Sequence, residues 1–290
     1  MKKFITVLMA VIMCLSLGIM AVGCGGTGKE KLIVYTEAGF APFEYTSQGK
    51  IVGVDVDIMN LVGEKLGKEI VFENVAFDVI VDAVAAGDLT NVGAAGLSIT
   101  PEREEKVAFS VPYYTASLYV IYKIDDDGAP EITESDKNAD GIIYWDSLAG
   151  KNVGVQGGTT ADLFLSDEIG AGGTLDGTGT NKTDYDSLSV AVSDIGLNID
   201  AVIIDELPAK TLVANNEGLA CLPLYYKGAT PEEDELAFDE YAIAVTKGQT
   251  ELLEAINEVL NELLEDVDED GNNGIQQLVM KHLDVSTENN

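Results

Sequence analysis

The sequence predicts an α/β protein made of two lobes, on three observations. Runs rich in β-branched residues alternate with segments whose apolar residues recur at helical spacing, a pattern typical of parallel sheets covered by helices. The alternation occurs twice, on either side of a β-prone connecting segment and an acidic stretch. The 290 residues are enough for two domains of ordinary size.

The first group of elements precedes residue 96. We expect strands at Lys31–Thr36, Glu69–Glu73 and Asn91–Ala95, a hairpin at Phe43–Val54, and helices at Val56–Leu66 and Phe77–Ala86. Gly67 and Gly87 directly follow the two predicted helices. They support these helix ends, because glycine readily adopts the left-handed conformation that terminates a helix. These elements alternate as expected for one α/β lobe.

The second group follows a connecting strand at Tyr113–Lys123 and an acidic loop at 125–141. We expect strands at Asn152–Gln156, Ala201–Ile204 and Tyr241–Val245, and helices at Thr160–Asp167, Leu207–Asn215 and Glu251–Val267. The last helix is strongly amphipathic, and we expect this closing segment to return to the first lobe. The predicted division is 31–114 with 242–285 as lobe I and 118–236 as lobe II. Two crossings between lobes make a hinge with a cleft beneath it.

The N-terminus predicts export. Two lysines precede an apolar run from Phe4 to Val22, as in a secretory signal, so residues 1–23 are interpreted as a signal peptide. The residues Ala21–Cys24 resemble the lipobox of bacterial lipoproteins, which predicts a lipid on Cys24 and a tether over 24–30. A retained membrane helix is the alternative, because the run is long enough to span a bilayer. Both place the remaining chain outside the cytoplasmic membrane.

Composition excludes several classes of function. The formal net charge of −33 argues against nucleic acid as a partner, since phosphate binding relies on clustered basic residues. Beyond the N-terminal segment only Cys221 remains, expected as a buried thiol, so no disulfide framework is predicted. The sole histidine, His282, is expected at the surface or a helix end.

No metal or cofactor is expected. Two acidic runs, 136–141 and 266–271, begin like calcium loops, with oxygen-bearing side chains at alternate positions and a glycine. The closing glutamate is absent from both, since Ser147 and Gln277 stand in its place. We interpret both runs as solvated turns.

Arginine occurs once among the 17 basic residues, as Arg103. A guanidinium group offers a planar fork that binds a carboxylate through two parallel hydrogen bonds, which lysine cannot reproduce. We therefore expect Arg103 to be an anion anchor. The alternative is an ordinary surface arginine paired with a neighbouring glutamate, which contributes less than about 1 kcal/mol.

Five sequence blocks carry a family resemblance. They are Ala41–Tyr45 (APFEY), Gly53–Asp57 (GVDVD), Ser98–Arg103 (SITPER), Val153–Thr160 (VGVQGGTT) and Asp200–Asp205 (DAVIID). In this order they resemble the extracellular solute-binding proteins of polar amino acid ABC transporters, family 3, from about Lys31 to Leu283. The resemblance implies the type II periplasmic-binding-protein fold, in which two lobes close on one small molecule. It also implies delivery of that molecule to an ABC transporter permease, and we expect a monomer.

A free amino acid presents a carboxylate, an ammonium group and a side chain. Arg103 is expected to bind the α-carboxylate, helped by Thr160 and by backbone N–H groups near Thr159, where a helix start adds positive potential. Asp205, at the carboxyl end of a predicted strand, is expected to bind the α-ammonium group. Further acceptors for the ammonium group are the Ser98 hydroxyl and the Gly96 carbonyl.

The resemblance implies that Glu37, Phe40 and Phe77 form the pocket for the ligand's side chain, because they match the pocket positions of the family pattern. Core packing is the alternative for both phenylalanines. Glu37 stands where the family often has a shorter acid, which favours a ligand with a cationic or amide side chain. The chain also departs from common members at Gly96, where serine is frequent, and in its longer 125–141 insertion.

The sequence therefore predicts a protein that binds an extracellular amino acid and is not an enzyme. Two alternatives use the same fold. An enzyme similar to cyclohexadienyl dehydratases would need an acid or base in the cleft, for which Glu37 is the one candidate. A ligand-sensing module would need a signalling segment after Leu283.

Overall fold

The computed structural model describes residues 29–124 and 141–288, and Lys31 onward forms one compact unit. The strands are β1 (Lys31–Thr36), β2 (Gly39–Phe40), β3 (Glu44–Ser47), β4 (Lys50–Val52), β5 (Glu69–Asn74), β6 (Val92–Gly93), β7 (Ala108–Phe109), β8 (Tyr114–Lys123), β9 (Ile143–Tyr144), β10 (Asn152–Gln156), β11 (Asn181–Tyr185), β12 (Ala201–Asp205), β13 (Leu219–Tyr226), β14 (Glu235–Leu236), β15 (Phe238–Tyr241) and β16 (Ala244–Val245). The helices are α2 (Val54–Leu66), α3 (Phe77–Ala86), α4 (Pro101–Lys106), α5 (Thr160–Ile169), α6 (Leu188–Ser193), α7 (Glu206–Ala214), α8 (Thr250–Glu265) and α9 (Gly274–Glu288), with short 3₁₀ turns at Trp145–Leu148 and Pro231–Glu233.

The first lobe is built on a sheet in the order β5-β1-β6-β16-β7. Strand β1 pairs in parallel with β5 and β6, whereas β16 pairs antiparallel with β6 and β7. Helix α2 buries Val54, Ile58 and Val62 against this lobe's core. Helix α8 packs on α2 and returns the end of the chain to the first lobe.

The second lobe is built on a sheet in the order β11-β10-β12-β8-β13-β14. Every residue of β12 is buried, as expected for a central strand covered on both faces. A core around Trp145, Leu148 and Leu165 lies beside it. The carboxyl end of β12 leads directly into α7, and that of β10 leads into α5 after a short turn at 157–159, so the residues at those turns face one edge of the sheet.

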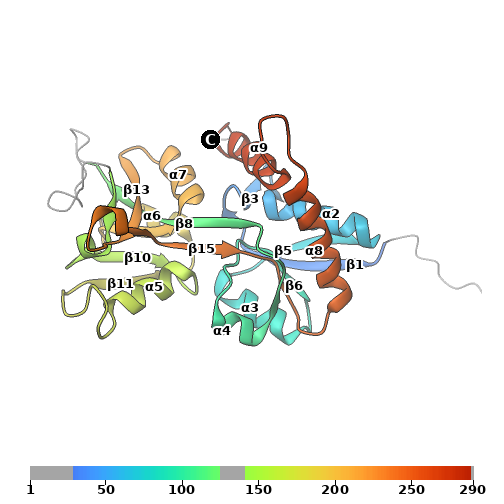
Figure 1. Cartoon of the computed structure of the whole chain (residues 1–290), viewed down its shortest axis with the longest axis horizontal. Helices are drawn as coiled ribbons and strands as arrows, with labels where there is room; N and C mark the ends of the chain where they lie inside the picture. The colour runs from blue at the N-terminus through green and yellow to red at the C-terminus, as the bar shows by residue number, and fades with distance from the viewer. Residues whose placement is uncertain (1–28, 125–140, 289–290) are drawn as a thin grey trace, which may run out of the picture. The chain divides into compact units, whose positions relative to one another are not determined.

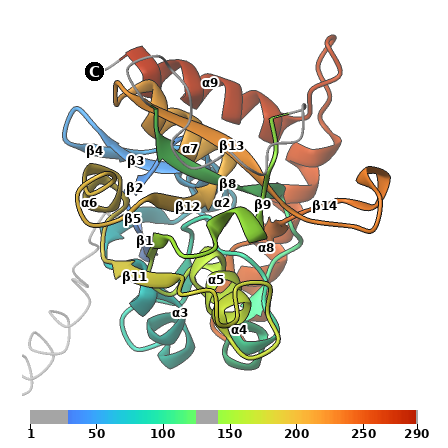
Figure 2. The same cartoon turned by 90° about the vertical axis from the view of Figure 1, so that its left-hand side faces the viewer.

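Two antiparallel strands join the lobes. Residues 114–117 of β8 pair with 241–238 of β15, and β8 then continues into the second sheet. Figure 1 shows β8 and β15 running side by side between the two sheets, and Figure 2 views the second lobe end-on. A pair of short crossing strands is a common construction for a hinge.

Several expected elements agree with the structure and one does not. Helix α3 and strands β1 and β10 have the expected bounds, and α5 begins at Thr160 as expected. The single strand expected at Tyr241–Val245 is wrong. Tyr241 pairs with Tyr114 in the connecting ribbon, whereas Ala244 pairs with Gly93 in the first sheet, so the chain changes partners between them.

His282 is buried, which corrects the expected surface position. It is 4% exposed, with Nε2 lying 2.9 Å from Asp57 Oδ2 and Nδ1 lying 3.2 Å from the Tyr45 hydroxyl. A carboxylate and a hydroxyl satisfy both ring nitrogens, so burial leaves neither unpaired. Cys221 likewise differs from expectation, because it is only partly buried.

Some expectations fall outside the described residues. These are the signal peptide, Cys24, most of the 24–30 tether and nearly all of the 125–141 loop. Within the described ranges, no helix has the length and apolar character that a bilayer crossing requires. The 266–271 run is a turn in which Asp268 Oδ1 accepts hydrogen bonds from the backbone N–H groups of Asp270 and Asn272.

Gly53 generates a stability prediction. Its φ is 142°, and a Cβ there would collide with the backbone carbonyl of Phe43. We expect Gly53→Ala to lower the free energy of unfolding by about 3 kcal/mol in urea titrations, through combined strain and collision. Gly49→Ala is the control, since its φ is 75° but no atom lies within 4 Å; it should lose about 1 kcal/mol. Equal losses would show that the collision is relieved at no cost.

Candidate functional site

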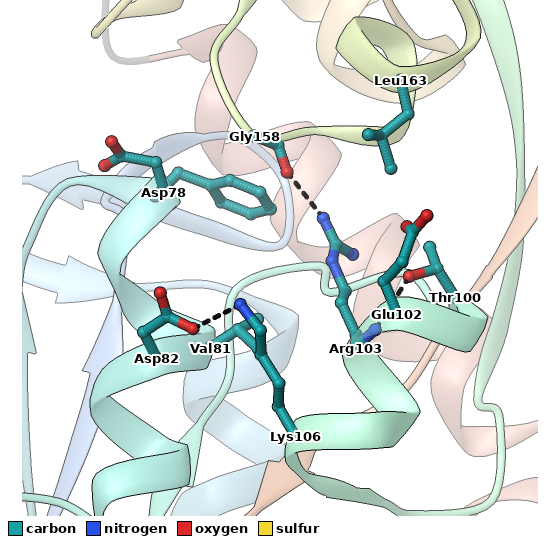
Figure 3. Close-up of a pocket in the computed structure, with 10 residues that line it drawn as sticks. Asp78, Val81, Asp82, Thr100, Glu102, Arg103, Lys106, Gly158 and Leu163 are labelled. Atoms are coloured by element: carbon teal, nitrogen blue, oxygen red, sulfur yellow. Dashed lines mark hydrogen bonds and ion pairs between the residues drawn. The ribbon is translucent and has the colours of Figure 1, made fainter. Parts of the chain in front are cut away.

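Arg103 lies between the two lobes with its side chain buried. Thr100 caps α4 by accepting a hydrogen bond from the Arg103 backbone N–H, and Pro101 starts the helix with a suitable φ. The guanidinium donates to the Ser98 carbonyl at 2.6 Å and to the Gly158 carbonyl of the second lobe at 2.8 Å. Figure 3 shows the Gly158 bond across the gap. At 7% exposure, Arg103 is not an ordinary surface arginine.

The start of α5 faces Arg103. Thr159 is the N-cap, and its hydroxyl accepts a hydrogen bond from the Asp162 backbone N–H. Thr160, the first helical residue, is 4% exposed. Gly158 has a φ of 78°, and a Cβ there would lie 3.1 Å from the Asp78 Cβ of the first lobe. A glycine therefore lets the positive end of the helix approach the other lobe closely.

A cavity of about 170 Å³ opens beside Arg103. Both lobes line it, through Phe77 and Arg103 on one side and Gly158 and Leu163 on the other. The Phe77 ring lies under the guanidinium, with 5.6 Å between Cζ and the ring centroid, a favourable cation–π distance. The cavity is the space drawn in Figure 3.

Asp205 ends β12 and is 9% exposed. Its Oδ1 atom is buried and has no partner within hydrogen-bond geometry among the described residues. Burial raises the pKa of Asp205 well above its ordinary value and the charge of Asp239 raises it further, whereas the nearby Tyr241 hydroxyl, the Asp205 backbone N–H and the Arg103 charge oppose both effects.

Asp239, on β15, is a residue that the sequence analysis missed. Its Oδ2 accepts hydrogen bonds from the Ser98 hydroxyl at 2.7 Å and from the Thr160 hydroxyl. Burial raises the pKa of Asp239, and these hydroxyls and Arg103 lower it again. Strand alternation could have found this residue, because it places Asp239 on the same buried face of β15 as Tyr241.

A buried acidic pair supports Gly96. Asp55 Oδ2 accepts from the Gly96 backbone N–H at 3.0 Å, and Asp55 Oδ1 accepts from the Tyr113 hydroxyl at 2.5 Å. Burial raises the pKa of Asp55 to about 6 and, together with the Asp55 charge, raises that of Glu44 well above its usual range. Gly96 has a φ of 52°, and a Cβ there would lie 2.9 Å from the Phe40 ring, so serine fits poorly here.

Of the residues expected around the ligand's side chain, Glu37 lies at the gap between the lobes and Phe40 lies in the core. Glu37 is half-buried, and burial raises its pKa, while a hydrogen bond from Gln156 of the second lobe lowers it. Phe40 is buried against Phe43 and Tyr241, with ring centroids 6.0 and 6.2 Å apart. Phe40 thus packs in the core of the first lobe beside Gly96, whereas Glu37 reaches the gap between lobes.

Comparisons with known proteins agree with this architecture. The family model for bacterial extracellular solute-binding proteins, family 3, matches residues 32–270. The arginine-binding extracellular protein ArtP of Bacillus subtilis (strain 168) is 29% identical over 271 residues, covering 91% of this chain and 93% of ArtP. A putative ABC transporter arginine-binding protein 2 of Escherichia coli (strain K12) is 30% identical over 242 residues, covering 83% and 88%.

Solved structures show the same two-lobed fold. The amino acid ABC transporter substrate-binding protein AbpA from Streptococcus pneumoniae Canada MDR_19A, bound to L-arginine, superposes with a TM-score of 0.70 at 29% identity, covering 89% of this chain and 96% of that one. An ancestral arginine-binding protein bound to arginine gives a TM-score of 0.68 at 29% identity, covering 87% and 98%. The chain belongs to family 3 of the bacterial extracellular solute-binding proteins.

Proposed function

We propose that this protein binds an amino acid with a polar or cationic side chain between its lobes and delivers it to an ABC transporter. One observation carries the proposal: the only guanidinium of the chain is buried where the lobes meet and donates to both of them. Relatives named for binding arginine and histidine support the ligand class. These relatives are binding proteins, so the function is binding rather than catalysis.

Arg103 and the start of α5 form the site for the α-carboxylate. A guanidinium has five N–H donors, so bonds to two carbonyls leave donors for a ligand. The first N–H groups of a helix have no partner inside the helix, which makes the backbone at Thr159 and Thr160 a second donor set. The Thr160 hydroxyl is engaged by Asp239, so we assign its backbone N–H to the carboxylate.

Asp205 forms the site for the α-ammonium group. Oδ1, which has no partner within hydrogen-bond geometry among the described residues, supplies an acceptor that is charged in the carboxylate form. The Ser98 hydroxyl, which donates to Asp239, keeps lone pairs that can accept from the ammonium group. The Gly96 carbonyl is the third acceptor, and its backbone is fixed by the bond from the Gly96 N–H to Asp55.

Glu37 and the aromatic ring of Phe77 form the side-chain pocket, and Phe40 packs in the core of the first lobe beside it. An acidic group at the gap favours a cationic side chain by direct charge attraction. Phe77 already stacks on one guanidinium, Arg103, which illustrates how its face can accommodate another planar cation. An arginine-like ligand therefore fits the chemistry of this pocket best.

Binding shifts the lobes toward a closed state. Arg103 belongs to the first lobe, and Thr160 and Asp205 to the second, so only the closed arrangement makes all contacts at once. We place lobe I at 31–114 with 242–285 and lobe II at 118–236. The protein acts outside the cytoplasmic membrane as a monomer, anchored by a lipid on Cys24 and docking on a permease.

A thermal-shift screen of the mature chain against the common amino acids tests the function. We expect a concentration-dependent rise in melting temperature with arginine, and smaller rises with other cationic or amide amino acids, because a ligand that binds only the folded state stabilises it. Prephenate is the control for a dehydratase. No shift with any amino acid, or consumption of prephenate, would contradict the proposal.

Arg103→Lys should weaken binding of L-arginine by about 10- to 100-fold in calorimetry, because an ammonium group cannot replace the two parallel bonds of the fork. Lys50→Gln is the matched control: it also alters one basic residue of the first lobe, and Lys50 is exposed at the start of β4. Affinity should be unchanged in the control. Equal affinities for wild type and Arg103→Lys would rule out the carboxylate assignment.

The raised pKa of Asp205 predicts a pH dependence. Binding an ammonium group requires the carboxylate form, so affinity should fall by up to about tenfold per pH unit as the pH drops below the raised pKa. Binding near that pH should release protons. Calorimetry in two buffers of different ionisation enthalpy measures this release, with Asp200→Asn as the control, since Asp200 is an exposed acid immediately before the same strand. An affinity that stays constant as the pH is raised from the ordinary pKa of an aspartate, 3.8, without proton release, would count against the ammonium role.

A further inference from the structure

We propose that Asp239 is a second carboxylate for the ligand's α-ammonium group, opposite Asp205, a role that rests on the amino-acid-binding function proposed above. Asp239 lies on β15, one of the two strands that connect the lobes. No residue of this strand belongs to the site expected from the five sequence blocks. The proposed binding site therefore includes a residue of the strands that connect the lobes.

Unpaired oxygen atoms are the first evidence. Oδ1 of Asp205 and Oδ1 of Asp239 are both buried, and neither has a partner within hydrogen-bond geometry in the described part of the chain. The nearby Tyr241 hydroxyl, itself buried and unpartnered by the same geometry, acts as a donor toward Asp205 and not toward Asp239. The side chains are 9% and 8% exposed, so bulk water does not satisfy them. Buried polar atoms are almost always paired, and each exception calls for a missing partner. Two such carboxylate oxygens are therefore expected to accept hydrogen bonds from a bound ligand.

The orientation of Asp239 is the second piece of evidence. Its other oxygen, Oδ2, is held by the Ser98 hydroxyl from the first lobe and by the Thr160 hydroxyl from the second. These two hydroxyl oxygens are 3.4 Å apart, so a single carboxylate oxygen accepts hydrogen bonds from both lobes. With Oδ2 fixed in this way, Oδ1 has a defined direction. Asp239 is thus positioned by the contact between lobes.

Charge is the third piece of evidence. Asp205 and Asp239 interact with one another as like charges, and Arg103 is the one cation among the described residues that acts on both. If both carboxylates are ionised, a single cation leaves one negative charge uncompensated, which is costly in a region of low dielectric constant. An ammonium group between them would restore the balance.

The chemistry of an ammonium group fits the acceptors. An ammonium nitrogen has three N–H donors and no acceptor. Asp205 Oδ1 and Asp239 Oδ1 would receive two of them, and the Ser98 hydroxyl or the Gly96 carbonyl would receive the third. A ligand held in this way couples closure of the hinge to recognition of its ammonium group.

The test compares Asp239→Asn with the wild-type mature chain in calorimetry, using L-arginine and L-citrulline. Citrulline keeps the α-ammonium group but replaces the cationic side chain with a neutral one of similar shape. We expect both ligands to lose about 10- to 100-fold in affinity, by the same factor, since a charge-assisted hydrogen bond is lost in each. Glu240→Gln is the control on the same strand, on its exposed face, and should change neither affinity by more than about twofold.

Two further variants distinguish binding of the ligand by Asp239 from a merely structural role of this residue. Asp239→Glu keeps the charge and should lose less affinity than Asp239→Asn. The double variant Asp205→Asn with Asp239→Asn should lose less than the product of the two single losses, because both acids act on one group. Circular dichroism and thermal unfolding verify that each variant is folded.

Three results would overturn the role of Asp239. Unchanged affinity in Asp239→Asn would remove it from the site. Tighter binding would show that Asp239 competes with the ligand's carboxylate for Ser98 and Thr160. A loss confined to arginine would assign Asp239 to the side-chain cation. Failure of the wild type to bind any amino acid would instead overturn the proposed function.

Discussion

The buried guanidinium of Arg103 is the interaction on which the arrangement of the lobes depends. Removing a charge from water is expensive unless hydrogen bonds compensate for the lost hydration. Here the compensation comes from two carbonyl groups, one in each lobe, and from the face of Phe77. Burial lowers the pKa of Arg103, and the charges of Asp239, Glu102 and Asp205 oppose that effect. The same group therefore links the lobes and attracts anions.

The acids around Arg103 are the reason why the proposed site would suit a zwitterion. When both are ionised, Asp205 and Asp239 carry more negative charge than one guanidinium balances, while the fork and the start of α5 still offer N–H donors. A ligand with a positive and a negative group placed close together satisfies both needs at once. A simple anion would leave the carboxylates unpaired, and a simple cation would leave the donors unused.

Much of the fold could be predicted from the sequence, because local patterns determine it. Glycines that end helices fixed the limits of α2 and α3, and a buried apolar run identified β12. The expected strand at Tyr241–Val245 was wrong, since the change from the hinge ribbon to the first sheet depends on pairing partners far away in sequence. His282 was misplaced for the same reason: its partner Asp57 is 225 positions away.

Part of the proposed site could be derived from the sequence. Arg103 was noticeable because the chain contains no other arginine, Asp205 because it ends a strand, and Thr160 because it begins a helix. Asp239 was missed because no strand was expected before Tyr241. The alternation along β15 places Asp239 on the buried face, but the hydroxyl donors that hold it come from Ser98 and Thr160, far away in sequence.

One measurement tests the central claim most directly. Because Arg103 is the sole arginine, protein labelled with ¹⁵N-arginine gives guanidinium signals from this side chain alone. The account predicts side-chain N–H signals that are protected from exchange with water and that shift to saturation at one equivalent of unlabelled L-arginine. Signals that remain at the positions of free arginine, exchange rapidly and do not respond to the ligand would contradict it.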